Sequence, residues 1–153
     1  MPVPTSKLGK ALRFDESGDR YIEFCKSTVP SEVSFSSLRI VIDCANGACY
    51  KVTPSIFREL GAEVIEMATN PDGFNINNKC GSTHPEALAK EVIKQRADYG
   101  LAMDGDGDRV VLVDSKGNLL DGDDILYILA FSNPNRTGAW SGIVGTLMTN
   151  YGL

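Results

Sequence analysis

With 153 residues, of which 42% are hydrophobic and 23% charged, the sequence has the composition of one globular domain, which excludes a disordered, collagen-like or coiled-coil protein. Its net charge is −5 and no basic stripe is present to neutralise phosphates, so nucleic acid is not an expected partner. The longest apolar run, Ile125–Phe131, has seven residues, far fewer than the ~20 that span a bilayer, so we expect no membrane contact and a cytoplasmic location.

The N-terminal part is expected to form one helix followed by a connector. A helix near Asp15–Lys26 would have an apolar face with i, i+3, i+4 spacing, formed by Tyr21, Phe24 and Cys25. The serine-rich segment Ser27–Ser37 is typical of a connector. We therefore divide the chain into an N-terminal helix with its connector, residues 1–37, and an α/β domain, residues 38–153.

The rest of the chain alternates between strands and helices. The expected strands are Arg39–Asp43, Glu63–Met67, Tyr99–Met103, Val110–Asp114 and Gly142–Leu147. Helices are expected from Thr53 to Leu60, from Thr83 to about Arg96, and after Asp121. This order predicts a three-layer α/β domain with a mixed, mostly parallel sheet of four to five strands flanked by helices. No helix separates the third strand from the fourth, so an antiparallel or bent pairing is expected there.

Local signals mark the turns and helix ends. Asn46-Gly47 predicts a turn after the first strand, and Gly61 occupies the position that follows a helix C-terminus. Thr83 and Glu86 have the spacing of a capping box, and Asp121 is expected to cap the last helix.

Zinc and disulfide chemistry are not indicated. The four cysteines form no C-x-x-C pair, and reduced, partly buried thiols are the expected reading of Cys25, Cys44, Cys49 and Cys80. The single histidine, His84, cannot complete a zinc set at the usual spacing. We expect His84 to be structural or adjacent to a substrate, whereas Asn75 and Asn77 would either bind a sugar or shape their loop.

The excess negative charge is concentrated in one segment. Seven aspartates stand against Arg109 and Lys116 between Asp104 and Asp124, so this window carries the whole net charge of −5. Such a concentration indicates a cation site or an acid-capped helix. The later aspartates fit a turn and a helix start, which leaves the first three as candidate ligands.

Asp104, Asp106 and Asp108 follow an apolar strand and alternate with two glycines. In extended backbone such residues point to one side, so their carboxylates can converge. Two like charges 4 Å apart repel by on the order of 4 kcal/mol at an effective dielectric of 20, so a cation is needed. Hard oxygen ligands without cysteine or histidine favour Mg²⁺, Ca²⁺ or Mn²⁺, and Mg²⁺ with the adjacent Arg109 indicates phosphoryl chemistry.

Three alternatives stay open for this segment. An aspartyl-phosphate phosphatase would use Asp104 as nucleophile and Asp106 as acid, although Asp108 stands where that class carries Thr or Val. A non-catalytic module that binds a divalent cation is the second alternative. The third is a tight acidic turn without a metal; an EF-hand is disfavoured because Arg109 and Ser115 replace its required Gly and Glu.

Several stretches together resemble the second domain of the phosphohexomutase family, and within it the branch that acts on glucosamine phosphates. The matching stretches are Arg20–Lys26, Val41–Ala48, Phe57–Ala62, Pro71–Asn77, Asp104–Arg109 and Val144–Met148. The resemblance implies a cytoplasmic isomerase that interconverts glucosamine 6-phosphate and glucosamine 1-phosphate, toward UDP-N-acetylglucosamine and cell-wall precursors. The reaction would pass through an enzyme phosphoserine and a bisphosphate intermediate.

The resemblance also implies roles and missing parts. Asp104, Asp106 and Asp108 would hold Mg²⁺ against the phosphoserine, and Arg109 would be a catalytic residue that helps to hold phosphate. The family's serine lies in a preceding domain, and Ser82-Thr83-His84-Pro85 is only a superficial echo of its loop. We therefore expect the remaining domains of the same enzyme as partners, a chain after about residue 148 that leads to a third domain, and no turnover by this chain alone.

Overall fold

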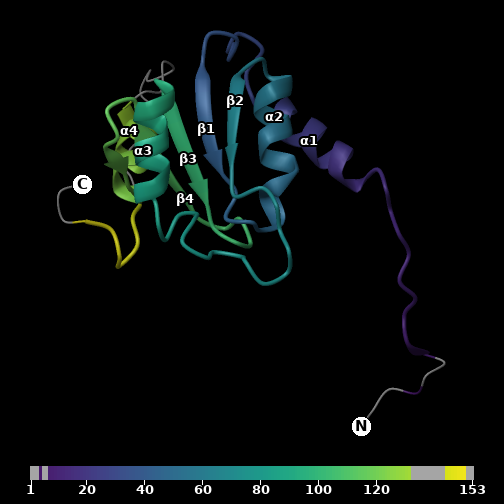
Figure 1. Cartoon of the computed structure of the whole chain (residues 1–153). Helices are drawn as coiled ribbons and strands as arrows, with labels where there is room; N and C mark the ends of the chain where they lie inside the picture. The colour runs from purple at the N-terminus through teal and green to yellow at the C-terminus, as the bar shows by residue number, and fades with distance from the viewer. Residues whose placement is uncertain (1–3, 5–6, 132–143, 151–153) are drawn as a thin grey trace.

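The computed structural model describes residue 4, residues 7–131 and residues 144–150. The strands are β1 (Arg39–Asp43), β2 (Glu63–Met67), β3 (Tyr99–Met103), β4 (Val110–Asp114) and β5 (Leu119–Leu120). The helices are α1 (Ser17–Ser27), the short 3₁₀ turn η2 (Ala48–Tyr50), α2 (Val52–Glu59), α3 (Glu86–Gln95) and α4 (Gly122–Phe131). They form an α/β domain from which residues 7–14 extend as a tail (Figure 1).

The five strands form one mixed sheet in the order β2-β1-β3-β4-β5. Strands β2, β1 and β3 are parallel. The predicted antiparallel pairing of β3 with β4 is confirmed, with Tyr99 opposite Asp114. The second antiparallel pair, β4 with β5, was not expected because β5 has only two residues, too few to show a pattern.

The two faces of the sheet bury separate apolar clusters, which makes the domain three-layered as predicted. Successive residues of β1 point to opposite faces. Val41 packs with helix α3 through Leu88 and Val92. Ile40 and Ile42 belong to the cluster on the other face, which includes Phe57 of α2, and the two helices flank the sheet (Figure 1).

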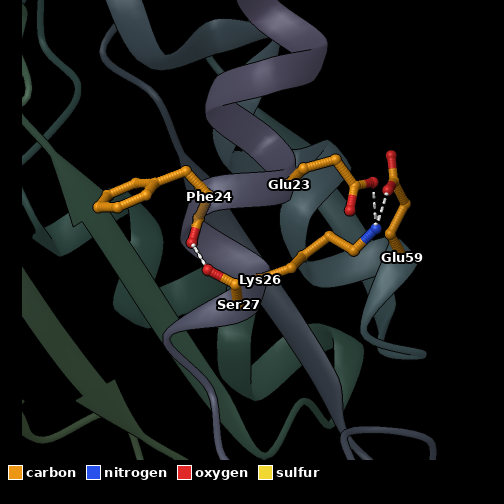
Figure 2. Close-up of polar contacts among 5 residues, drawn as sticks. All are labelled: Glu23, Phe24, Lys26, Ser27 and Glu59. Atoms are coloured by element: carbon orange, nitrogen blue, oxygen red, sulfur yellow. Dashed lines mark hydrogen bonds and ion pairs between the residues drawn. The ribbon is translucent and has the colours of Figure 1, made fainter.

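Helix α1 packs on α2, but not by the predicted face. Tyr21 and Phe24 are 56% and 65% exposed, whereas Ile22 is 8% exposed. The spacing correctly indicated a helix, but it could not show which side faces the domain. In Figure 2 the ammonium group of Lys26 lies between the carboxylates of Glu23 and Glu59, 2.7 Å from each, while the Phe24 ring points away from this contact.

The expected connector is packed against the domain rather than running free. Phe35 lies edge-on to Phe57 with ring centroids 5.8 Å apart, and it belongs to the cluster beneath α2. Aromatic pairs of this geometry contribute about 0.5–1.5 kcal/mol beyond their buried area. The serine-rich segment therefore closes one side of the core and leads directly into β1.

Two local predictions at helix ends had opposite outcomes. The capping box at Thr83 is wrong: α3 begins at Glu86, after Pro85, and no side chain caps it. The cap at Asp121 is confirmed, because its carboxylate accepts the N–H groups of Asp123 and Asp124. Among the helices of residues 7–131, none is long and apolar enough to cross a membrane.

The predicted last strand, Gly142–Leu147, is wrong for residues 144–147, the part of it that the structure describes. Residues 144–146 have no regular structure and Leu147 begins a turn, while residues 142 and 143 lie outside the described part of the chain. The apolar, β-branched run resembled a strand, but its described residues pair with no strand of the sheet. Val144, Leu147 and Met148 are almost fully exposed instead.

Candidate metal and phosphate site

The candidate site lies at the carboxyl edge of the parallel strands. Because β1, β2 and β3 run in the same direction, the loops that follow them meet at one edge of the sheet, the lower edge in Figure 1. In open α/β sheets this edge is where ligands bind. The acidic loop, residues 104–109, begins there directly after β3.

The structure brings the three predicted carboxylates together. One oxygen each from Asp104, Asp106 and Asp108 lie within 4.8 Å of one another. Asp104 is buried with 7% exposure, whereas Asp106 and Asp108 are exposed. The arrangement therefore has one fixed ligand at its base and two ligands open to solvent, the donor set that suits a hard divalent cation.

The pKa shifts within the cluster indicate that its carboxylates repel one another. Burial is the largest influence on the pKa of Asp104 and acts to raise it, but hydrogen bonds from the Arg109 N–H and with the Asp108 and Asp106 carboxyls together lower it. The pKa of Asp108 is raised, first by its hydrogen bond with Asp104 and then by the negative charges of Asp106 and Asp104. A bound cation would relieve this repulsion, so the residues present fit a divalent metal.

Arg109 supplies a mobile positive charge beside the cluster. Its backbone N–H donates to Asp104 at 3.1 Å, which fixes where the side chain leaves the loop. The guanidinium Nε lies 3.7 Å from carboxylate oxygens of both Asp104 and Asp108, longer than a hydrogen bond. The side chain is 70% exposed and thus free to turn its planar donors toward an anion such as phosphate.

The two glycines of the acidic loop lie close to neighbouring side chains. Gly107 has φ +77°, and a Cβ there would lie 2.5 Å from the sulfur of Cys49. A Cβ on Gly105 would lie 2.6 Å from Ile76 and 2.7 Å from the side-chain amide of Asn77. These neighbours are side-chain atoms that can rotate away, so a larger residue is costly mainly at Gly107, where the positive φ strains any residue with a Cβ.

The residues that hold the acidic loop in place were not predicted from the sequence. Asp43, the last residue of β1, is fully buried, and its carboxylate accepts the N–H groups of Ala45 and Gly81. Gly47 contacts the backbone of Gly105 directly. The available signal was a carboxylate at the end of a buried strand, three residues before the Asn of an Asn-Gly turn.

The other candidates at this edge divide between loop-shaping and exposed positions. Asn75 shapes its loop, because its side chain accepts the N–H of Asp72 and donates to the carbonyl of Asn70. His84 is exposed in the turn before α3. The hydroxyl of Ser82 is buried without a hydrogen-bond partner in the described part of the chain, so it is not placed to accept a phosphoryl group from solvent.

A hollow of about 420 Å³ lies away from the acidic loop. It is formed where the start of α4 meets residues 144–149. Asp121, Asp123, Thr146 and Thr149 are among its lining residues, and none of the three predicted metal ligands reaches it. The candidate site is therefore separate from this hollow.

Comparison with known proteins identifies the same domain. Residues 19–117 match the family described as phosphoglucomutase/phosphomannomutase, alpha/beta/alpha domain II. The phosphoglucosamine mutase of Legionella pneumophila (strain Lens) is 58% identical over 151 residues, which are 99% of this chain and 33% of that protein. The phosphoglucosamine mutase of Hahella chejuensis is 57% identical over 150 residues, 98% of this chain and 34% of that protein.

Solved structures show the same fold. A phosphoglucomutase/phosphomannomutase family protein from Burkholderia thailandensis aligns with a TM-score of 0.63 and 30% identity, over 74% of this chain and 25% of its own. A putative phosphomannomutase from Thermus thermophilus aligns with the same TM-score at 20% identity, over 75% of this chain and 28% of its own.

These matches also define how much of the relatives is represented. The chain spans about a third of the length of the curated relatives it matches. Helix α4 lies beyond the matched residues 19–117. The expectation drawn from the acidic loop and its neighbouring stretches is confirmed: the chain belongs to the phosphoglucomutase/phosphomannomutase family and carries its α/β/α domain II.

Proposed function

We propose that this chain is the metal-binding domain of a phosphoglucosamine mutase that interconverts glucosamine 6-phosphate and glucosamine 1-phosphate in the cytoplasm. The observation that carries the proposal is the cluster of three aspartate oxygens within 4.8 Å, in a chain 58% identical to phosphoglucosamine mutases. The phosphoserine and the sugar-selecting groups would come from the other two thirds of the enzyme. The boundary at residues 37 and 38, and a third domain after about residue 148, belong to the same proposal.

In this proposal each residue of the acidic loop has a separate task. Asp104 is held by the N–H of Arg109 and would fix the base of a Mg²⁺ site, while Asp106 and Asp108 would close it from the solvent side. When bound, Mg²⁺ would neutralise charge on the oxygens of the transferring phosphoryl group. Arg109 would turn from the carboxylates toward the phosphate and bind it through two parallel N–H groups.

No observation favours the phosphatase over the mutase. A phosphatase would need Asp104 as an open nucleophile, but this carboxylate is buried and is engaged by the N–H of Arg109. The position of Arg109 beside the cluster also supports phosphate binding over a purely structural cation module.

The metal site is tested by titrating the 153-residue chain with Mn²⁺ and recording the electron paramagnetic resonance signal of the free ion. We expect one weak site, because the phosphoserine oxygen that would complete the coordination is absent. Asp106→Asn is expected to weaken binding at least tenfold, whereas Asp19→Asn, which removes the same charge from an exposed position on α1, is not. Tight Mn²⁺ binding, or equal loss in both variants, would count against the proposal.

The catalytic role is tested by a chimera. The corresponding third of the Legionella pneumophila phosphoglucosamine mutase is replaced by this chain, and conversion of glucosamine 6-phosphate is followed by ³¹P NMR. We expect the chimera to be active, the chimera with Asp106→Asn to lose at least a hundredfold in kcat, and the isolated chain to be inactive. Turnover by the isolated chain would refute the division of labour.

A further inference from the structure

Two loops contact the acidic loop and the end of β3 that leads into it. The first loop, residues 45–49, donates the N–H of Ala48 to the carbonyl of Gly105 at 2.8 Å. The second loop, residues 76–82, donates the N–H of Ser82 to the carbonyl of Met103 at 2.9 Å and packs Asn77 against Gly105. Neither loop carries a predicted ligand, yet together they determine where the acidic loop lies.

Both loops have an unfavourable backbone conformation. Ala45 and Asn46 in the first loop, and Asn77 and Lys79 in the second, have φ between +49° and +56°. Asparagine adopts this left-handed region more readily than other residues with a Cβ, so the strain falls mainly on Ala45 and Lys79, which other contacts must hold in place. Strained residues of this kind gather at functional sites, where the surrounding structure over-determines them.

One buried carboxylate connects the two loops. Asp43 accepts the N–H of Ala45 at 2.9 Å on one oxygen and the N–H of Gly81 at 2.8 Å on the other. Gly81 has φ +75°, and a Cβ on it would lie 2.6 Å from the Cβ of Ala45 and 2.5 Å from the carbonyl oxygen of Met103. The N–H of Asn77 also donates to the carbonyl of Ala45, so the loops touch beside this carboxylate.

A carboxylate is an expensive group to bury here. Asp43 has no exposed surface, and burial raises the pKa of Asp43 despite the two N–H groups that it accepts. A neutral amide has only one oxygen and therefore can accept only one of the two N–H groups in the same orientation. The requirement for two acceptors aimed at two different loops explains why this position holds a carboxylate.

We propose that Asp43 is a positioning residue for the acidic loop: by tying the two strained loops together, it sets the spacing of Asp104, Asp106 and Asp108. The ligand part of this inference rests on the proposed metal function, whereas the tie between the loops does not. The consequence is that removing one acceptor at Asp43 loosens both loops and weakens cation binding, although Asp43 itself contributes no ligand.

The tie is tested by amide hydrogen exchange in Asp43→Asn. Exchange at Ala48 and Ser82, expressed relative to the core amide of Val41 in the same sample, is expected to accelerate at least tenfold. The control, Val92→Ala, lowers stability within the cluster between α3 and the sheet, which contains no residue of either loop, and should not raise these ratios. Unchanged ratios in Asp43→Asn would overturn the proposal.

Two further measurements keep the result decisive. If Asp43→Asn does not fold, Gly81→Ala is measured instead, because it disturbs the hydrogen bond that Gly81 donates to Asp43. Exchange must then accelerate at Ala48 in the first loop as well as at Ser82 in the second. Acceleration at Ser82 alone refutes the proposal that Asp43 couples the two loops. Mn²⁺ binding is expected to weaken at least fivefold in Asp43→Asn. If Asp43→Asn and wild type bind Mn²⁺ with equal affinity, Asp43 does not position the ligands, and only that part of the proposal is refuted. If wild type itself binds no Mn²⁺, the proposed metal function is refuted, and hydrogen exchange alone decides whether Asp43 ties the two loops together.

Discussion

Gly47→Ala should destabilise the domain because it forces two backbones apart. A Cβ at this position would lie 2.2 Å from the carbonyl oxygen of Gly105 and 2.6 Å from its Cα. These are backbone atoms, so no side-chain rotation can relieve the clash. The neighbouring hydrogen bond from Ala48 to Gly105 would be lost as the acidic loop moves away.

The magnitude follows from three terms. Overpacking of this kind costs about 1–3 kcal/mol, and the lost hydrogen bond about 1 kcal/mol. Gly47 has φ −106° and ψ −162°, which alanine adopts without strain, so reduced freedom of the unfolded chain returns about 0.4–1 kcal/mol. The net loss of unfolding free energy is expected to be about 1–3.5 kcal/mol.

Urea denaturation followed by circular dichroism measures this loss. With a slope of about 2 kcal/mol per molar urea, the midpoint should fall by about 0.5–1.8 M. Gly122→Ala is the matched control, because a Cβ there meets nothing within 4 Å, and its midpoint should stay near that of wild type. A Gly47→Ala midpoint equal to that of the control would refute the close approach of the two loops.

Three further predictions concern the core, a thiol and an ion pair. Leu88→Ala, at a fully buried position, should lose about 2–5 kcal/mol in the same assay, whereas Ile93→Ala, at a 55% exposed position, should lose far less; equal losses would contradict the packing of α3. Burial raises the pKa of the Cys44 thiol to about 12, so at pH 8 only about one thiol in ten thousand is ionised. Mass spectrometry should therefore find Cys44 alkylated by iodoacetamide only after unfolding. Rapid labelling of the folded protein would disprove the burial of Cys44. The hydrogen bond from Arg58 lowers the pKa of Glu66 below its ordinary 4.5, so the stability from ionised Glu66 is present above that pH and is lost as pH falls through the folded pKa. Glu66→Gln should therefore cost at most about 1 kcal/mol at pH 7 and nothing at strongly acid pH, and a difference independent of pH would rule out this ion pair.

The acidic loop shows which features of a site can be predicted from a short stretch of sequence. Alternation of aspartate with glycine after an apolar strand predicted convergent carboxylates, and the carboxylates do converge, although residues 105–107 bend, with Gly107 at φ +77°, instead of forming the extended backbone on which the prediction was based. The same reasoning could not find Asp43, whose second partner, Gly81, is 38 residues away in the sequence. It correctly interpreted Gly47 as a turn residue, because the Gly47 N–H donates to the carbonyl of Cys44, but it could not show that Gly47 also contacts Gly105.

The errors in secondary structure have a common cause. Tyr21 and Phe24 have helical spacing, but they face solvent because α1 packs mainly against α2, and Ile22 is its one buried residue. The expected strand at Gly142–Leu147 has the right residue types, but a strand forms only where a neighbour offers its backbone. The residue types of a segment indicate which secondary structures it can form. Whether it forms one, and which side it buries, depends on the elements available to pack or pair with it.

The sequence by itself determined the alternation of strands and helices, the three-layer class, the antiparallel turn from β3 to β4 and the three candidate ligands. Each of these depends on periodicity or composition within a short segment, where geometry follows from the backbone alone. Only the tertiary structure decided which face of α1 is buried, how β5 completes the sheet, and how two strained loops meet at Asp43 beneath the acidic loop. Those features depend on contacts between residues distant in the chain, and such contacts exist only once the sheet has brought its carboxyl edge together.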